Sequence, residues 1–160
     1  MTTVTFGKHS GKSVELIVLK FPDYVRWMNR RKNKAGRLQK AMSVALKLIK
    51  QFDNKPFVER CCGPGCKNLA TRCSLYRDSV IEPYWWCDEC DHYAFGARPG
   101  HLAVVSTYVQ AIKHVGSYCP DKPAPYRTLI RELAKAKGLP PRLGEKQALE
   151  FFKSDDEWGR

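Results

Sequence analysis

Six of the seven cysteines lie within residues 61–90, and four of them are spaced like the ligands of one metal ion. The two stretches that carry them are CCGPGC at residues 61–66 and CDEC at residues 87–90. A cysteine pair on each of two tight turns can present four thiolates, and zinc binds such a set tetrahedrally. The spacing therefore predicts a Zn²⁺ site with these ligands: Cys61, Cys66, Cys87 and Cys90.

The first cysteine pair can be assigned in two ways. Four residues separate Cys61 from Cys66 and three separate Cys62 from Cys66, so either spacing permits ligation. We prefer Cys61, because a four-residue turn with glycine before the second cysteine recurs in zinc knuckles, and Cys62 is the alternative. The other cysteines are interpreted as structural: Cys73 as a buried residue of a strand, and Cys119 as a residue without a nearby partner.

Four thiolates would close the coordination sphere of the ion and leave no position for a reactive water. The His-x-Glu signature that accompanies Cys-x-x-Cys in zinc deaminases does not precede Cys87. The ion is therefore expected to be structural, and the chain is expected not to be an enzyme. A metal-dependent nuclease is a third hypothesis, without a His-Asn-His or paired-carboxylate motif. Its histidines would be drawn from His9, His92, His101 and His114.

The basic charge is concentrated in the first third of the chain. The formal net charge is +12, and residues 1–60 carry 14 Lys and Arg against 4 Asp and Glu. Residues 61–100 carry 4 against 5, and residues 101–160 carry 10 against 7. A basic surface of this kind favours a polyanionic partner, and nucleic acid is the usual one, with DNA preferred here.

The stretch from Arg26 to Lys50 has nine Lys and Arg and no acid, which is unfavourable through self-repulsion unless a polyanion binds there. If about six such groups contacted phosphates, binding to duplex DNA would show a salt slope of about −5. The predicted nucleic-acid contacts are Lys8, His9, Lys12, Arg26, Arg30, Arg31, Lys32, Lys34, Arg37, Lys40 and Lys47.

The stretch FGKHSGKS at residues 6–13 looks like a phosphate-binding loop but is too short to be one. Only three residues separate Gly7 from Gly11-Lys12-Ser13, one fewer than in the Walker motif Gly-x-x-x-x-Gly-Lys-Ser/Thr. The two glycines suit a tight turn with positive φ. We expect this turn to project Lys8, His9 and Lys12 into solvent, where they can reach phosphates.

The hydrophobic periodicity predicts an α+β fold in which short strands and helices position these groups. Strands are expected at residues 2–6, 71–76 and 84–86, and helices at residues 14–20, 22–28, 37–52, 101–114, 126–137 and 144–152, followed by a loose acidic tail at 154–160. Composition divides the chain into a basic strand-loop-helix module (1–54), a zinc-ribbon or treble-clef-like β segment (55–100) and a C-terminal helical segment (101–160).

The stretch FGKHSGKSVELIVLKFPDYVRWM at residues 6–28 resembles the small domain behind the catalytic domain of exodeoxyribonuclease X-like enzymes. Free-standing small bacterial and phage proteins carry this domain too. The match consists of Phe6-Gly7-Lys8, Gly11-Lys12 and Asp23-Tyr24-Val25-Arg26-Trp27, and it covers about 23 of the 160 residues. The resemblance implies a compact module that engages nucleic acid beside a nuclease, while the nuclease activity itself does not carry over. We interpret Phe6, Tyr24 and Trp27 as the small core of this module, and base-stacking is the alternative role for these aromatic residues.

These observations favour a zinc-stabilised nucleic-acid-binding accessory protein without catalytic activity. The alternative is a protein-interaction adaptor that modulates a replication, transcription or defence enzyme, such as a nuclease or polymerase. Its contact would be formed by residues around the second cysteine pair: Trp85, Trp86, Asp88, Glu89 and Asp91. No apolar run is long enough to span a bilayer and no signal peptide is recognisable, so no membrane partner is expected. Metal-ligating cysteines fit a reducing compartment, and we expect the protein in the cytoplasm.

Overall fold

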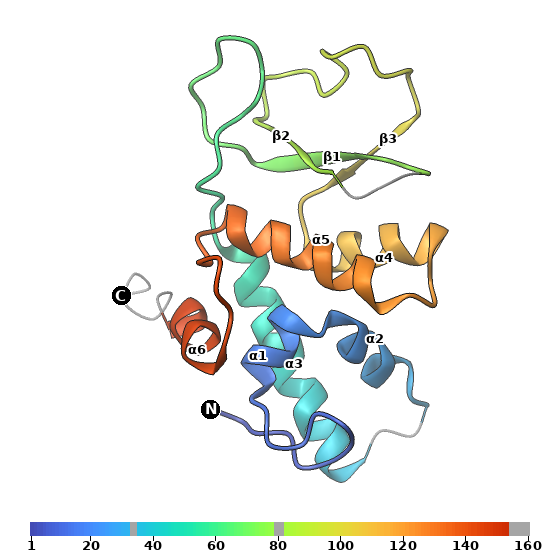
Figure 1. Cartoon of the computed structure of the whole chain (residues 1–160), viewed down its shortest axis with the longest axis vertical. Helices are drawn as coiled ribbons and strands as arrows, with labels where there is room; N and C mark the ends of the chain where they lie inside the picture. The colour runs from blue at the N-terminus through green and yellow to red at the C-terminus, as the bar shows by residue number, and fades with distance from the viewer. Residues whose placement is uncertain (33–34, 79–81, 154–160) are drawn as a thin grey trace. The chain divides into compact units, whose positions relative to one another are not determined.

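A computed structural model describes residues 1–32, 35–78 and 82–153, which form two compact units (Figure 1). Unit 1 contains Met1–Lys55 together with the chain from Leu139 onward, and unit 2 contains Pro56–Gly138. The boundary expected near residue 100 falls inside unit 2, because the strand that follows it pairs with a strand of the zinc segment. The expected acidic tail lies outside the described residues.

Unit 1 is helical in its described part. Its helices are α1 (Val14–Lys20), α2 (Pro22–Arg30), α3 (Gly36–Asn54) and α6 (Glu145–Lys153). Helix α1 is buried along most of its length and contacts each of the other three. The Ser13 hydroxyl accepts a hydrogen bond from the Leu16 backbone N–H at 3.1 Å, so it caps α1. Pro22 begins α2, where its missing N–H leaves no helical hydrogen bond unmade.

Helix α3 has one buried face and one basic face. The buried residues recur at helical spacing and are Ala41, Met42, Ala45, Leu48, Ile49 and Phe52. Leu46 belongs to the same apolar helical pattern but is 55% exposed. Successive residues are about 100° apart around a helix, so Leu46 points away from the buried face on which Ala45 lies.

The N-terminal stretch forms a loop closed by a single bridge, and the strand expected at residues 2–6 is wrong. Thr3 pairs with Ser13 in an isolated antiparallel bridge. Gly7 and Gly11 have φ angles of 68° and 90°. Because both glycines adopt left-handed conformations, the chain reverses within a few residues. The two sides of the loop are held together by backbone hydrogen bonds from the Val14 N–H to the Thr2 carbonyl, from the Val4 N–H to the Lys12 carbonyl and from the Gly11 N–H to the Val4 carbonyl.

Unit 2 contains a small antiparallel sheet with strand order β2-β1-β3 (Figure 1). The strands are β1 (Arg72–Tyr76), β2 (Tyr84–Trp86) and β3 (Leu102–Val105). In the register of the central strand, Cys73 lies opposite Trp85 on one side and opposite Val105 on the other. The structure therefore confirms both strands that the sequence predicts for the zinc segment, and adds β3.

The helix expected over residues 101–114 is wrong in its first part, where β3 lies. Val104 and Val105 are β-branched, and pairing with β1 overrides the helix-compatible apolar pattern of this stretch. Helix α4 (Tyr108–Tyr118) begins only after Thr107, which forms a capping box with Gln110. The capping box marks the start of this helix in the sequence.

Helix α5 (Pro123–Ala136) begins at Pro123, earlier than the start expected at Tyr126. Prolines are tolerated in the first turn of a helix, so the proline-rich stretch opens α5 and does not merely precede it. Helix α5 contacts α4, and α4 contacts β3. The fold is α+β, as predicted. Among the described residues, every helix is too short or too polar to span a membrane.

Candidate metal centre and basic surface

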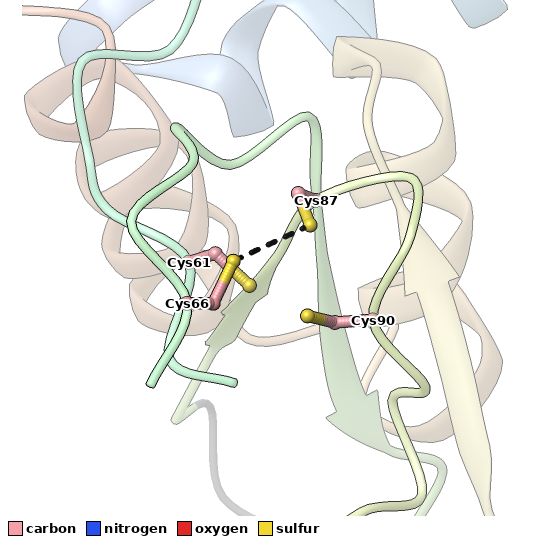
Figure 2. Close-up of side chains that lie close together, drawn as sticks. All are labelled: Cys61, Cys66, Cys87 and Cys90. Carbon is pink, nitrogen blue, oxygen red and sulfur yellow. Dashed lines mark hydrogen bonds between the residues drawn. The ribbon is translucent and has the colours of Figure 1, made fainter. Parts of the chain in front are cut away.

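The four predicted cysteine ligands lie together in unit 2, with their sulfur atoms directed toward one another (Figure 2). The Sγ atoms of Cys61, Cys66, Cys87 and Cys90 all lie within 4.8 Å of one another, and those of Cys66 and Cys87 are 3.8 Å apart. Sulfurs about 2.3 Å from one ion at the corners of a tetrahedron are about 3.8 Å apart. The cluster can therefore hold a metal ion such as zinc with little rearrangement.

The first cysteine pair lies in a tight turn closed by an isolated bridge between Arg60 and Leu69. Inside this turn the Cys66 N–H donates to the Gly63 carbonyl at 3.0 Å, and the Gly63 N–H donates to Cys61 Sγ at 3.4 Å. A Cβ atom at position 63 would lie 2.6 Å from Cys90 Sγ. Glycine is therefore required there, because any side chain would enter the space between the sulfurs.

The second pair follows directly after β2, whose last residue is anchored to β1 and to the residue before β1. Trp86, the last residue of β2, is buried, and its indole N–H donates to the Ser74 hydroxyl of β1 at 2.8 Å. Its carbonyl accepts from the Thr71 N–H at 2.8 Å. These bonds fix the strand end from which Cys87 and Cys90 project.

Cys62, the alternative ligand, is turned away from the cluster. Its Sγ donates to the Trp85 carbonyl at 2.7 Å, and its backbone N–H donates to the same oxygen at 2.8 Å. The geometry thus selects Cys61 from the two assignments that the spacing permits. Cys73 is fully buried in β1, as expected, and burial raises the pKa of its thiol to about 12.

The electrostatics of the cluster suit a bound cation. The pKa of Cys87 is lowered to about 6, first because the Asn68 amide donates to its sulfur and next because the Glu89 N–H does so. The pKa of Cys90 is raised, first by its hydrogen bond to Cys87 and then by its hydrogen bonds to the neighbouring thiols. The thiolate is therefore favoured at Cys87 and disfavoured at Cys90, and a bound cation would stabilise a thiolate at Cys90 as well.

The acidic residues beside the second pair already have partners within unit 2. Asp88 accepts hydrogen bonds from Thr71 at 2.6 Å and from Arg72, and these two contacts, Thr71 first, hold the pKa of its carboxyl below the usual range. Asp91 accepts from the Tyr93 backbone N–H at 2.9 Å. Both carboxylates therefore serve the local structure of this loop.

Most of the predicted nucleic-acid contacts are exposed side chains of unit 1. Arg26 is half-buried on α2, and Lys34 lies outside the described residues. Arg37 and Lys40 line a hollow of about 230 Å³ beside the N-terminal residues, where the Arg37 guanidinium donates to the Thr5 carbonyl at 3.0 Å. The exposed members of the predicted set are Lys8, Arg30, Arg31, Lys32, Arg37, Lys40 and Lys47.

The prediction that His9 and Lys12 project into solvent is wrong. His9 is 4% exposed, with its ring 4.3 Å from the Phe21 ring and 4.6 Å from the Tyr24 ring. The Lys12 ammonium donates to His9 Nδ1 at 2.9 Å and lies 4.6 Å from the Phe21 ring centre. The glycine turn folds these two side chains back onto the helices, so only Lys8 of the three points outward.

The aromatic residues of the resembling stretch are not all core. Tyr24 is buried and Phe6 is half-buried, but Trp27 is 43% exposed. The sequence contains a signal for this exposure, because the residues before and after Trp27 at helical spacing, Asp23 and Arg30, are charged. Trp27 therefore borders the polar face of α2 and does not belong to the core predicted for this stretch.

The four histidines of the nuclease hypothesis are divided between the two units. His9 belongs to unit 1, and His92, His101 and His114 belong to unit 2. His114 is buried beside Tyr118, with the two ring centres 5.2 Å apart. The cysteine cluster is the one group of three or more metal-ligating side chains found within the described part of the chain.

Comparisons of the chain with protein-family models, with curated proteins and with solved structures found no match.

Proposed function

We propose that the protein binds nucleic acid, with DNA preferred, through the basic surface of unit 1, and that a structural Zn²⁺ ion stabilises unit 2. The observation that carries the proposal is the charge of α2, α3 and the segment between them. From Arg26 to Lys50 the chain has nine Lys and Arg and no acid, and most of the described ones are exposed. Such a surface attracts phosphates and releases their counterions on binding.

The resemblance of residues 6–28 to the module beside exodeoxyribonuclease X-like nucleases supports the same proposal. Lys8 is exposed in the glycine turn of that module, and the exposed residues Arg30, Arg31 and Lys32 lie at the end of α2 and directly after it. The zinc ion has a different part in the proposal. Four thiolates would leave it no open coordination position, so it organises unit 2 and contributes no chemistry.

Fluorescence anisotropy with matched single-stranded DNA, duplex DNA and RNA oligonucleotides over a salt series would test the proposal. We expect binding at low salt with a steep salt dependence. Replacing Arg30, Arg31 and Lys32 with glutamine should reduce the slope on duplex DNA by about 2 to 3, since each phosphate contact contributes about 0.9.

The matched control removes the same charge from unit 2, at the exposed residues Lys67, Arg98 and Lys113. This control should bind with a slope close to that of the unchanged protein. Absence of binding to every oligonucleotide at low salt, or equal losses in the two triple variants, would contradict the assignment of the basic surface.

The adaptor is a second candidate, and exposed aromatic residues of unit 2 favour it. Phe95 is 57% and Tyr84 is 41% exposed, and their ring centres are 6.1 Å apart. The tryptophans expected in this role are less accessible, since Trp86 is buried and Trp85 is half-buried against Phe57. An adaptor would capture a protein partner that stays bound after nuclease treatment, and Phe95→Ala would weaken that capture.

A further inference from the structure

The exposed indole of Trp27 is held in place by a series of aromatic rings in unit 1. It stacks on Tyr24 with ring centres 5.1 Å apart and an angle of 19° between the planes. Tyr24 is buried and meets the His9 ring edge-on, and His9 lies against Phe21. Because these contacts hold the indole in one orientation, a planar ligand that stacked on it would cost little side-chain entropy.

Beside this indole lies an open hollow of about 400 Å³, lined by Gly7, Lys8, Asp23, Tyr24 and Trp27. Volumes of about 300 to 1,000 Å³ are typical of small-ligand sites. Gly7 keeps the hollow in its present form, because a Cβ atom there would lie 2.6 Å from the Tyr24 hydroxyl. The hollow thus combines an aromatic wall with one carboxylate and one ammonium group.

This combination suits a nucleobase better than a phosphate. The Asp23 carboxylate repels phosphate but can accept a hydrogen bond from an exocyclic amino group of a base. Lys8 lines the hollow and can meet an adjoining phosphate. The Arg31 guanidinium lies over the Trp27 ring, 5.0 Å from its centre, so a base that stacks there takes its place and leaves it to meet a phosphate. In a duplex the faces of the bases are covered by their neighbours, so only an unpaired base can stack on an indole.

We propose that the hollow beside Trp27 receives an unpaired nucleobase, which stacks on the indole and makes the protein prefer single-stranded nucleic acid over duplex. The inference rests on the proposed function, because it assigns a substrate class to the same basic unit. Cations of unit 1 would supply the affinity for the backbone, and Trp27 would supply the discrimination between unpaired and paired strands.

The test compares Trp27→Ala, Trp27→Phe and the unchanged full chain, with a labelled single-stranded oligonucleotide and the matching duplex in fluorescence anisotropy. Loss of one stacked base should weaken single-strand binding about ten-fold in Trp27→Ala and leave duplex binding and the salt slope unchanged. Trp27→Phe should retain most of the affinity, because a smaller ring can still stack. Leu46→Ala is the matched control, since Leu46 is also an exposed apolar residue of a unit 1 helix.

A second measurement needs no variant and so does not depend on how Trp27→Ala folds. The unchanged protein is given a chain of abasic sites with the charge and length of the single-stranded probe, and binding should again be about ten-fold weaker. Equal affinity for the abasic and normal strands, or equal losses on single strand and duplex in Trp27→Ala, would overturn the stacking site while leaving the basic surface intact. Failure of the unchanged protein to bind any probe would overturn the proposed function and the stacking site together.

Discussion

Cys61 and Cys62 are adjacent in the chain, but their sulfur atoms have different partners. Cys61 Sγ lies in the four-cysteine cluster and accepts from the Gly63 N–H, whereas Cys62 Sγ is bonded to the Trp85 carbonyl. We predict that Cys61→Ala loses zinc and that Cys62→Ala retains about one ion per chain. Replacing a residue that only hydrogen-bonds to a ligand typically weakens metal binding about 10- to 100-fold. Removing a ligand itself should weaken zinc binding by more than this.

Metal content by elemental analysis of the purified variants, followed by competition with a chromogenic chelator, measures this difference. Cys73→Ala is a control for the loss of a buried thiol outside the cluster. The opposite result, with zinc retained by Cys61→Ala and lost by Cys62→Ala, would mean that the first turn rearranges when the ion binds.

At the residue scale, cysteine spacing could predict the cluster because each pair is local, and a tight turn leaves few directions for its two sulfurs. Spacing could not separate Cys61 from Cys62, since that choice depends on a carbonyl of β2 far along the chain. The burial of His9 was likewise not predictable. It depends on contacts of the ring with Phe21 and Tyr24, which form only when the glycine turn folds back onto the start of α2.

At the scale of elements, a side chain of α6 is bonded to the start of α1. Glu145, the first residue of α6, accepts from the Ser13 backbone N–H at 3.0 Å and from the Ser13 hydroxyl at 2.5 Å. We predict that Glu145→Ala lowers the free energy of unfolding of unit 1 by about 1 to 3 kcal/mol, as expected for hydrogen bonds to a charged group. Urea denaturation followed by far-ultraviolet circular dichroism measures the loss.

Glu150→Ala is the matched control, because Glu150 is an exposed glutamate of the same helix. Its effect should stay within about 0.5 kcal/mol, which is usual for surface substitutions. Equal stability of the Glu145→Ala and Glu150→Ala variants would show that the bonds to Ser13 add nothing beyond the packing of α6 on α1.

The elements differ in how far the sequence predicted them, and the differences have physical causes. Helix α3 was predictable because its apolar residues recur at helical spacing over 19 residues. Strand β3 was missed because its four residues are too short to show a period and are apolar like the helix that follows. Helix α5 begins three residues before the expected start, because prolines, which usually interrupt helices, are accepted in its first turn.

At the scale of the whole molecule, the chain forms unit 1 from two stretches, with unit 2 inserted between them. Composition could not predict this, because the return of the chain to unit 1 after Leu139 rests on long-range contacts such as that of Glu145 with Ser13. The metal ligands all belong to unit 2, while the buried residues of α1 and α3 are apolar and include no cysteine. Metal removal should therefore affect the two units differently.

We predict that a strong chelator unfolds the cysteine turns and the sheet of unit 2 but leaves unit 1 folded. Zinc binding stabilises the unit that contains its ligands. If unit 2 unfolds, the two stretches of unit 1 are joined by a longer flexible loop, and the entropy cost of closing a loop rises only slowly with its length. Hydrogen exchange with and without chelator measures this: amides of β1 should lose protection, and amides of α1 and α3 should keep it. Loss of protection in both units would show that they fold as one cooperative body, whereas unchanged protection in β1 would contradict a structural role for the ion.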